Sequence, residues 1–451
     1  MKTNHFLLNA AIFCTQLAVV PASQAIGVGS VQQPVQQLPQ IVDQRTEPLL
    51  DSHLPEASER RSSVTIPVLD IRARDAFSHL PLMLPERIQI PALDGSPALI
   101  DVRVENGWRA VEQQWLVVIT AAEIALLEEP GIEIIDQTSL NELDMLVVRF
   151  RVTSTLDSRE ALERIMPASV IDSLDRNHIY APQSDNQVDG GIRASEFAMP
   201  FICNKPVTIG MVDTAIELDH PSLRQTTVTQ KHFLPGMKQA TKHGTAVASV
   251  LAGRRPDNGI AKLPQANLFN ASVFFDRDGL SEGATLLHLL EGLEWLLAQK
   301  VAVINISMAG PENRLLEAVT RRIAESGTAL VAAVGNAGPA AQPLYPAAYP
   351  HVVGVTAVDE FREVYRWANQ GPQVEFAALG VNVLLAHAGQ AFEEQSGTSL
   401  AAPLVTGYVA CAMESTGLST DAVLDRMAEQ AIDLGDPGRD PTFGHGLLGE
   451  N

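Results

Sequence analysis

An aspartate, a histidine and a serine stand in three short segments of this chain whose other residues are mostly small or apolar. Asp213 closes an apolar, β-branched run, His243 opens a stretch of small residues, and Ser399 stands near the head of a segment rich in alanine and glycine. Taken singly, Asp213 and Ser399 could cap helices, and His243 could be a hydrogen-bonded core residue. Together, an acid, a base and an alcohol are the groups used in acyl transfer, where histidine takes the serine proton and aspartate orients the histidine.

The segments around these residues predict the elements that position them. The run 206–214 is typical of a buried parallel strand that delivers Asp213 at its carboxyl end, where α/β sheets place their sites. Residues 243–253 predict a helix with a glycine at its C-cap. In 396–407 we expect a helix that begins beside Ser399, where free N–H groups and the helix dipole stabilise negative charge.

Strands and helices alternate over the second half of the chain. Helices are predicted at 286–299 and 315–326, between short apolar strands. This alternation predicts an α/β fold with a mostly parallel, doubly wound sheet, helices on both faces and the site at the carboxyl ends of the strands. The predicted strands end near Asp213, Phe274, Ser307, Asn336 and Val358.

Five ordered segments resemble the motifs of the subtilisin-like serine proteases, or subtilases. The resemblance covers about residues 200–450, and three of the segments carry Asp213, His243 and Ser399 in the family's chain order. It implies a catalytic triad in which Ser399 is the nucleophile, His243 the general base and Asp213 the partner of the histidine.

The two other segments, 304–311 and 331–338, resemble the family's cleft strand and oxyanion-hole loop. The resemblance implies that the Asn336 side chain and the backbone N–H of Ser399 bind the developing oxyanion. It also implies that the cleft strand pairs with an extended substrate. The substrate-binding residues expected on this basis are Ser307, Met308, Ala309, Gly310 and Gly335.

Three alanines depart from the family pattern. Ala215, Ala309 and Ala347 stand where subtilases usually have glycine, and the methyl of Ala309 is expected to crowd a bound peptide. None of these positions belongs to the predicted triad. The departures therefore bear on substrate preference and leave the expected reaction unchanged.

Composition limits the classes of partner. The chain has 451 residues, of which 46% are hydrophobic, and this supports two or three domains with a sizeable core. The formal net charge of −21 argues against nucleic acid and anionic membranes as partners. Protein or peptide substrates are the expected partners, together with an N-terminal region of the chain itself.

The first 25 residues predict a signal peptide, with Lys2 before the apolar stretch 6–20 and small residues before a cleavage site after Ala25. A weakly hydrophobic membrane anchor is the alternative interpretation. We expect export to the periplasm or the extracellular space, with no membrane attachment once the signal is removed.

The remaining chain is predicted to divide into a flexible linker at 26–60, a small α+β domain at 61–183, a linker at 184–199 and the subtilisin-like domain at 200–451. The α+β domain has a predicted β-α-β-β-α-β order, with helices at 121–129 and 158–166 and a last strand at 170–180. This order resembles the inhibitory propeptides of subtilases, and the polar, glycine-bearing segment 183–191 suits cleavage between the two domains. An unrelated domain that stays attached is the alternative.

Two cysteines, Cys203 and Cys411, remain after signal removal. A disulfide is permitted in an oxidising compartment, but we expect two independent buried thiols. No Cys or His cluster has zinc spacing, so no metal ligands are predicted and no cofactor is needed for the chemistry. Structural calcium is common in subtilases, although no segment here has convincing calcium-ligand spacing.

These observations predict an exported serine endopeptidase that is made as a self-processing zymogen. Two alternatives remain open. One is a non-catalytic protein-binding module on the same fold, and the other is a dedicated maturation protease that acts on one partner.

Overall fold

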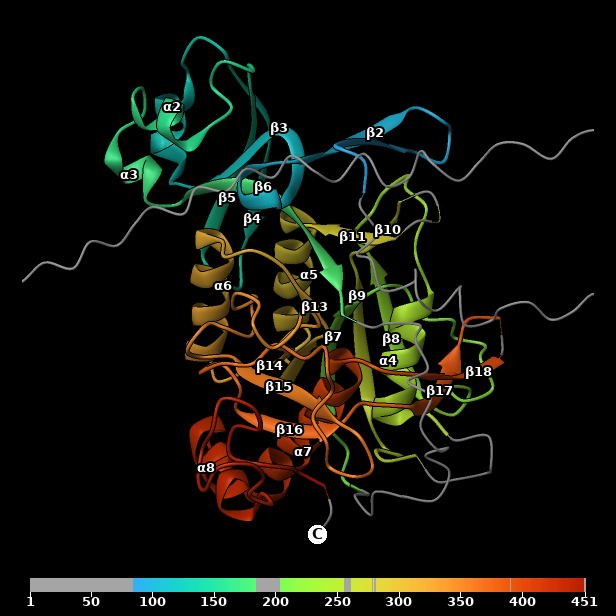
Figure 1. Ribbon diagram of the computed structural model, residues 1–451. Coiled ribbons are helices and arrows are strands. Elements are labelled where there is room, and N and C mark those ends of the chain that lie inside the picture. The colour runs from blue at the N-terminus through green and yellow to red at the C-terminus, as the bar shows by residue number, and fades with distance from the viewer. Residues whose placement is uncertain are drawn as a thin grey trace, which may run out of the picture. The chain divides into compact units, whose positions relative to one another are not determined.

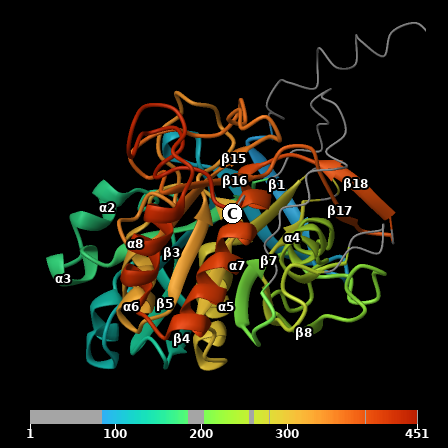
Figure 2. The ribbon, with the colours of Figure 1, turned by 90° about the horizontal axis from the view of Figure 1, so that it is seen from below.

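The computed structural model describes residues 84–183, 203–254, 261–277, 279, 281–389 and 391–449, which belong to one compact unit, Leu80–Asn451. The predicted signal peptide, both predicted linkers and residues 61–83 of the predicted α+β domain lie outside the described residues. Figures 1 and 2 show the arrangement of the elements from two directions.

A seven-stranded sheet forms the centre of the described chain from residue 203 onward, which we call the subtilisin-like part after the sequence prediction. Its strand order is β16-β15-β14-β12-β7-β9-β8. Every pair of neighbouring strands is parallel, and most strands are buried along their length, which explains their apolar, β-branched sequences. The prediction of a mostly parallel sheet is confirmed. The strands are β7 (Thr208–Asp213), β8 (Thr227–His232), β9 (Asn267–Ser272), β12 (Val303–Ile306), β14 (Ala329–Ala333), β15 (Val353–Val358) and β16 (Phe376–Leu379).

Helices cover both faces of this sheet (Figure 1). Along β7, Ile209 and Met211 pack in the core under α4 and α7, whereas Val212 packs in the core under α5 and α6, as alternation along a strand requires. The doubly wound arrangement is thus the observed one. The helices are α4 (Lys242–Ala252), α5 (Leu286–Ala298), α6 (Arg314–Glu325), α7 (Thr398–Thr416) and α8 (Thr420–Gln430), and the hairpin β17 (Val383–His387) and β18 (Ala391–Gln395) lies beside α4.

Residues 84–183, which we call the N-terminal region, form a mixed α+β structure around a separate core that contains Trp115, Phe150 and Leu162. The predicted helix at 158–166 is shorter, because Pro167 begins a new turn, and the first part of the predicted last strand is helical. The elements are β1 (Arg87–Pro91), β2 (Pro97–Arg103), η1 (Glu105–Gly107), β3 (Arg109–Val118), η2 (Ala121–Leu127), β4 (Ile132–Leu140), β5 (Met145–Val152), α2 (Arg159–Glu163), α3 (Ala168–Ile171) and β6 (Leu174–Pro182).

Strand β6 belongs to the N-terminal region and also pairs with the subtilisin-like part. It pairs with β3 at its start and then, antiparallel, with β11 (Glu282–Thr285) and β13 (Met308–Ala309). With β10 (Phe275–Asp276) this pairing extends one sheet across both parts of the chain. The end of β6 is therefore held along the edge where the strands of the central sheet terminate.

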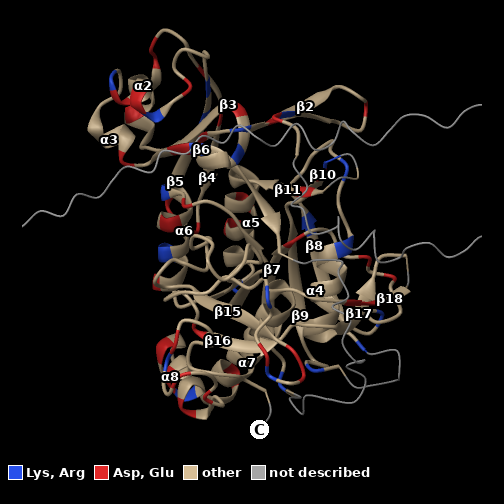
Figure 3. Ribbon diagram, viewed as in Figure 1, with Lys and Arg blue, Asp and Glu red and all other residues tan. Residues whose placement is uncertain are grey.

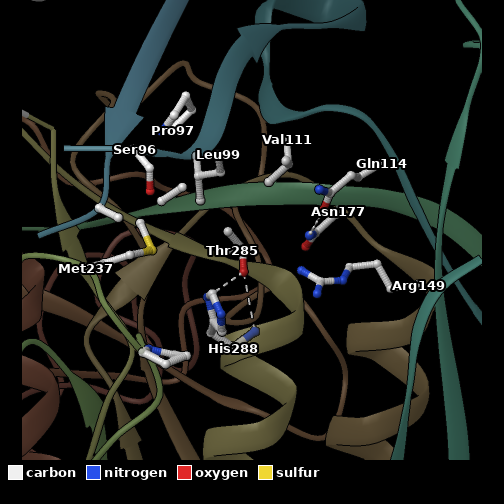
Figure 4. A pocket seen from close by; sticks show the side chains of 13 residues that line it. Ser96, Pro97, Leu99, Val111, Gln114, Arg149, Asn177, Met237, Thr285 and His288 are labelled. Atoms are coloured by element: carbon white, nitrogen blue, oxygen red, sulfur yellow. Dashed lines mark hydrogen bonds between the residues drawn. The ribbon is translucent and has the colours of Figure 1, made fainter. Parts of the chain in front are cut away.

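Figure 4 shows a hollow that is lined by residues of the N-terminal region, among them Asn177, and by residues of the subtilisin-like part, among them His288. Thr285 Oγ1 lies 2.9 Å from His288 Nδ1, and the Leu287 amide donates to Asn177 Oδ1 over 3.2 Å. Burial, with a smaller contribution from the charge of Arg149, lowers the pKa of His288 to about 4. His288 is therefore neutral at physiological pH, and its contact with Thr285 at the start of α5 joins two uncharged groups.

Cys203 and Cys411 form a disulfide, so the prediction of independent thiols is wrong. Helix α7 runs from Ser399 at the carboxyl edge of the sheet back toward its opposite edge, where Cys203 precedes β7. The twelve helical steps from Ser399 to Cys411 span about 18 Å. A six-residue strand spans about 20 Å. The two cysteines consequently meet with their Cα atoms 6.1 Å apart.

None of the helices in the described part of the chain is long and apolar enough to cross a bilayer.

Replacing both cysteines by alanine should lower the free energy of unfolding by about 2–5 kcal/mol, because the cross-link restricts the unfolded chain. Guanidinium unfolding followed by tryptophan fluorescence would measure the change. Reducing the wild-type protein should give a similar loss, and an unchanged midpoint in both cases would contradict a stabilising role for the disulfide.

Candidate active site

Asp213, His243 and Ser399 come together at the carboxyl edge of the central sheet. Asp213 ends β7, and His243 and Ser399 are each the second residue of a helix, α4 and α7. His243 Nδ1 lies 2.7 Å from Asp213 Oδ1, and His243 Nε2 lies 3.1 Å from Ser399 Oγ. All three side chains are buried. With its Nδ1–H donated to Asp213, the imidazole has Nε2 free to accept the serine proton.

The loop after Asp213 is fixed by residues that the sequence did not single out. The Thr214 amide donates to Asp213 Oδ1 over 2.7 Å, and the Asn270 side chain donates to the Thr214 carbonyl over 2.9 Å. Gly244 permits the close approach of α4, since a Cβ there would lie 2.4 Å from the Thr214 carbonyl oxygen. Asn270 had no clear signal in the sequence, because β9 also contains Asn267 and Ser272.

The carbonyl oxygen of Gln183 accepts two hydrogen bonds from groups predicted to form the oxyanion hole. Asn336 Nδ2 donates to it over 2.9 Å and the Ser399 backbone N–H over 3.2 Å. The Oδ1 atom of Asn336 accepts from the Thr398 amide and hydroxyl, at 3.1 and 2.9 Å. These two bonds fix the orientation of the Asn336 amide, so its Nδ2 points at the Gln183 carbonyl.

Residues 180–183 lie along the predicted cleft strand. The Gln183 amide donates to the Ser307 carbonyl over 3.3 Å, and Pro182 and Ala181 pair with Met308 and Ala309. The methyl of Ala309 does not prevent this antiparallel pairing, contrary to the expected crowding.

Glycine is required at two of the predicted substrate-binding positions. A Cβ on Gly310 would lie 2.4 Å from the ring of Tyr180, whose hydroxyl donates to the Pro311 carbonyl over 3.2 Å. Gly335 has a φ of +106° and donates its amide to Thr398 Oγ1 over 3.2 Å. Gly310 therefore makes room for the bound segment, and Gly335 helps to position the loop before Ser399.

The site is electrostatically biased toward a protonated histidine. Burial lowers the pKa of His243, but the charge and hydrogen bond of Asp213, with the charge of Glu282, outweigh burial and raise it. Glu282, a half-buried residue of β11, was not expected from the sequence. Burial, and then the nearby charges of Asp213 and Asp276, raise the pKa of Glu282 to about 6 against the opposing effects of His243 and Lys242.

Comparisons with known proteins identify the family of the chain. Residues 204–446, more than half of the chain, match the model of the subtilase family. The chain belongs to the subtilase family. This is a family of serine endopeptidases that need no cofactor for catalysis. In the parts of the chain that the structure describes, no group of three or more His, Cys, Asp or Glu side chains is placed to hold a metal ion.

Three curated subtilases illustrate the similarity. Subtilisin DY of Bacillus licheniformis is 31% identical over 240 residues, 51% of this chain and 85% of that protein. The major intracellular serine protease of Bacillus subtilis (strain 168) is 30% identical over 233 residues, 49% and 72% of the two chains. The minor extracellular protease Epr of Bacillus subtilis (strain 168) is 29% identical over 250 residues, 55% of this chain and only 38% of that longer protein.

A solved structure shares the fold. Fervidolysin from Fervidobacterium pennivorans, described as a keratinolytic enzyme related to subtilisin, aligns with a TM-score of 0.62 at 18% identity. The alignment covers 82% of this chain and 63% of fervidolysin.

Glu282→Gln should move the acid limb of the kcat/KM profile to lower pH. The negative charge of Glu282 favours the imidazolium, so its removal lowers the pKa of His243, and the neutral base then persists to lower pH. Peptide hydrolysis between pH 4 and 9 would measure the limb. The control Glu414→Gln, an exposed change late in α7, should leave it in place; a limb unmoved in Glu282→Gln, or moved upward, would refute this electrostatic role.

Proposed function

We propose that this protein is an exported serine endopeptidase that is made as a zymogen and cuts its own chain after Gln183. The observation that carries the proposal is the Gln183 carbonyl, which accepts hydrogen bonds from both Asn336 and the Ser399 amide while Ser399 Oγ lies beside His243. A carbonyl held in this way is the electrophile that a serine peptidase requires.

The proposed reaction uses two acyl-transfer steps. Ser399 Oγ attacks the carbonyl carbon of the scissile bond while His243 Nε2 takes its proton, and the negative oxygen that forms is held by Asn336 and the Ser399 amide. His243 then gives the proton to the leaving amine, and the carbon–nitrogen bond breaks to leave an acyl-enzyme. Water, deprotonated by His243, attacks the ester and releases Ser399 and a carboxylate. Asp213 holds the imidazole and stabilises its charged form throughout.

The N-terminal region is proposed to act as the inhibitory prodomain. Its last strand, β6, continues into the cleft and pairs with β11 and β13 on either side. An extended segment added to strand edges in this way has the geometry of a bound substrate. When the bond between Gln183 and Ser184 is cut, the pairing of residues 179–183 remains, so the product is expected to occupy and block the cleft until it dissociates.

Export is supported by two independent features. The first 25 residues have the pattern of a signal peptide. The Cys203–Cys411 disulfide is characteristic of proteins that fold in oxidising compartments. Among the relatives, the protease Epr is named as extracellular, whereas another is named as intracellular. We therefore propose a periplasmic or extracellular protease whose substrates are proteins or peptides.

Ser399→Ala should lower kcat on a peptide substrate by about 10⁶, and Asn336→Ala by about 10²–10³, effects of the size known for subtilisin. The first change removes the nucleophile and the second removes one oxyanion donor. Fluorogenic peptide hydrolysis would measure both, and labelling by a fluorophosphonate should be lost only in Ser399→Ala. Wild-type turnover by Ser399→Ala would overturn the triad assignment. A wild-type protein that neither hydrolyses peptides nor reacts with the fluorophosphonate would favour the binding-module alternative.

The wild-type protein should mature to a chain that begins at Ser184, whereas Ser399→Ala should keep the peptide bond after Gln183 intact. N-terminal sequencing and intact mass would identify the two products. Ser415→Ala, which changes an exposed serine of the same helix, serves as the control and should mature normally. Cleavage of Ser399→Ala at the same bond in a purified preparation would show that another protease makes this cut.

A further inference from the structure

A buried ion pair joins the N-terminal region to the rim of the cleft. Arg277, directly after β10, donates from Nε to Asp101 Oδ2 over 2.7 Å. The side chains of both residues are at most 3% exposed. Arg109, also of the N-terminal region, binds the other carboxylate oxygen of Asp101 over 2.6 Å. Figure 3 shows charged residues of both signs in the area of β2, β10 and β11, where this contact lies.

The other contacts of Arg277 come from its own part of the chain. Its Nη1 donates to the Glu282 carbonyl over 2.7 Å and to Ser281 Oγ over 3.2 Å, and its guanidinium lies 5.8 Å from the centre of the Phe275 ring. These contacts do not depend on the N-terminal region. The guanidinium is therefore held in place when Asp101 is removed.

Arg277 also lies beside the bound segment. A Cβ placed on Gly283 would be 2.8 Å from Arg277 Nη2 and 2.9 Å from Ile179 Cγ2, so the guanidinium and the Ile179 side chain meet over the same glycine. Ile179 is the fifth residue back from the bond after Gln183. The side chain of a substrate at this place would lie within about 6 Å of the guanidinium.

Loss of the N-terminal region changes the surroundings of both groups. Burial lowers the pKa of Arg277, and the charge and hydrogen bond of Asp101 raise it. The positive charge of Arg109 lowers it. Asp101 and Arg109 are both lost when the cleaved N-terminal region dissociates. Ile179 packs against Ile88, Ile90 and Val111, which leave as well. The processed enzyme would thus present a cation, still bonded to Glu282 and Ser281, that has become accessible to a substrate in the cleft.

We propose that Arg277 is a specificity-determining residue that binds a substrate carboxylate, selecting glutamate or aspartate at the fifth position before the scissile bond. This inference rests on the proposed function. Asp101 occupies the site in the zymogen, and an acidic substrate side chain replaces it in the processed enzyme. Unlike a lysine on a flexible chain, a planar guanidinium whose Nη1 is already bonded to Glu282 and Ser281 retains a defined direction for a carboxylate.

The test compares two fluorogenic peptides on the processed enzyme, freed of residues up to Gln183. Both carry Tyr-Ala-Pro-Gln before the scissile bond, preceded by glutamate in one and glutamine in the other. A charge-assisted hydrogen bond predicts a kcat/KM about tenfold higher for the glutamate peptide at low salt. The preference should shrink at 1 M salt, where exposed charges are screened.

In Arg277→Gln the ratio of kcat/KM for the glutamate peptide to that for the glutamine peptide should fall to about one. Arg277→Lys should keep part of this preference, because the positive charge remains while the planar guanidinium is lost. Arg439→Gln, a change beside Glu375 and remote from β11, should keep the full ratio. Equal values for the two peptides in the wild type, or an unchanged ratio in Arg277→Gln, would overturn the inference.

A binding measurement tests the Arg277 site independently of the proposed protease activity. The same two peptides, ending at the glutamine carboxylate, can be titrated by fluorescence anisotropy, which needs no turnover. A binding ratio that depends on Arg277 supports the carboxylate site even if neither peptide is hydrolysed, and absence of hydrolysis would count against the endopeptidase assignment alone. Turnover of both peptides with no binding preference would overturn the Arg277 site and leave the protease assignment intact.

Discussion

The contact between the end of β7 and the start of α4 is the constraint on which the site depends. His243 reaches Asp213 only because the next residue, Gly244, brings its backbone against Thr214, where any side chain would collide with the carbonyl oxygen. The same approach lets the Gly244 amide bond to the Thr214 hydroxyl. The small residues of α4 thus set the distance between His243 and Asp213 as well as allowing the helix to pack. A bulkier helix would hold the imidazole too far from the carboxylate.

Strand β6 links the chemistry to the architecture. It is part of the core sheet of the N-terminal region and, over its last residues, it is also the extended segment beside the nucleophile. One strand therefore pairs with strands of both parts of the chain. The buried Asp101–Arg277 pair joins the two parts at a second point. Removing one partner of such a pair leaves a buried charge unpaired, which is costly. The N-terminal region is consequently anchored by both backbone pairing and charge, in addition to apolar packing.

Much of the fold and the main site residues could be predicted because their signals are local. Asp213 ends an apolar run, and His243 and Ser399 head stretches of small residues, so each segment predicts its own element. Glu282 and Arg277 had no such signal, since their importance comes from strands that pair only after folding. The disulfide was missed for the same reason: the proximity of Cys203 and Cys411 follows from the return of α7 across the sheet, and 208 residues separate the two in the chain.

The disulfide also affects how well the protein withstands proteolysis. Because it encloses most of the subtilisin-like part, a nick in any surface loop between its two sulfurs leaves the fragments covalently joined. The loop ends then stay at high local concentration, and the packed sheet can hold them in register. A molecule that circulates among copies of itself gains from this arrangement, since isolated autolytic cuts would not by themselves disperse the helix that bears the nucleophile from the strand that bears the acid.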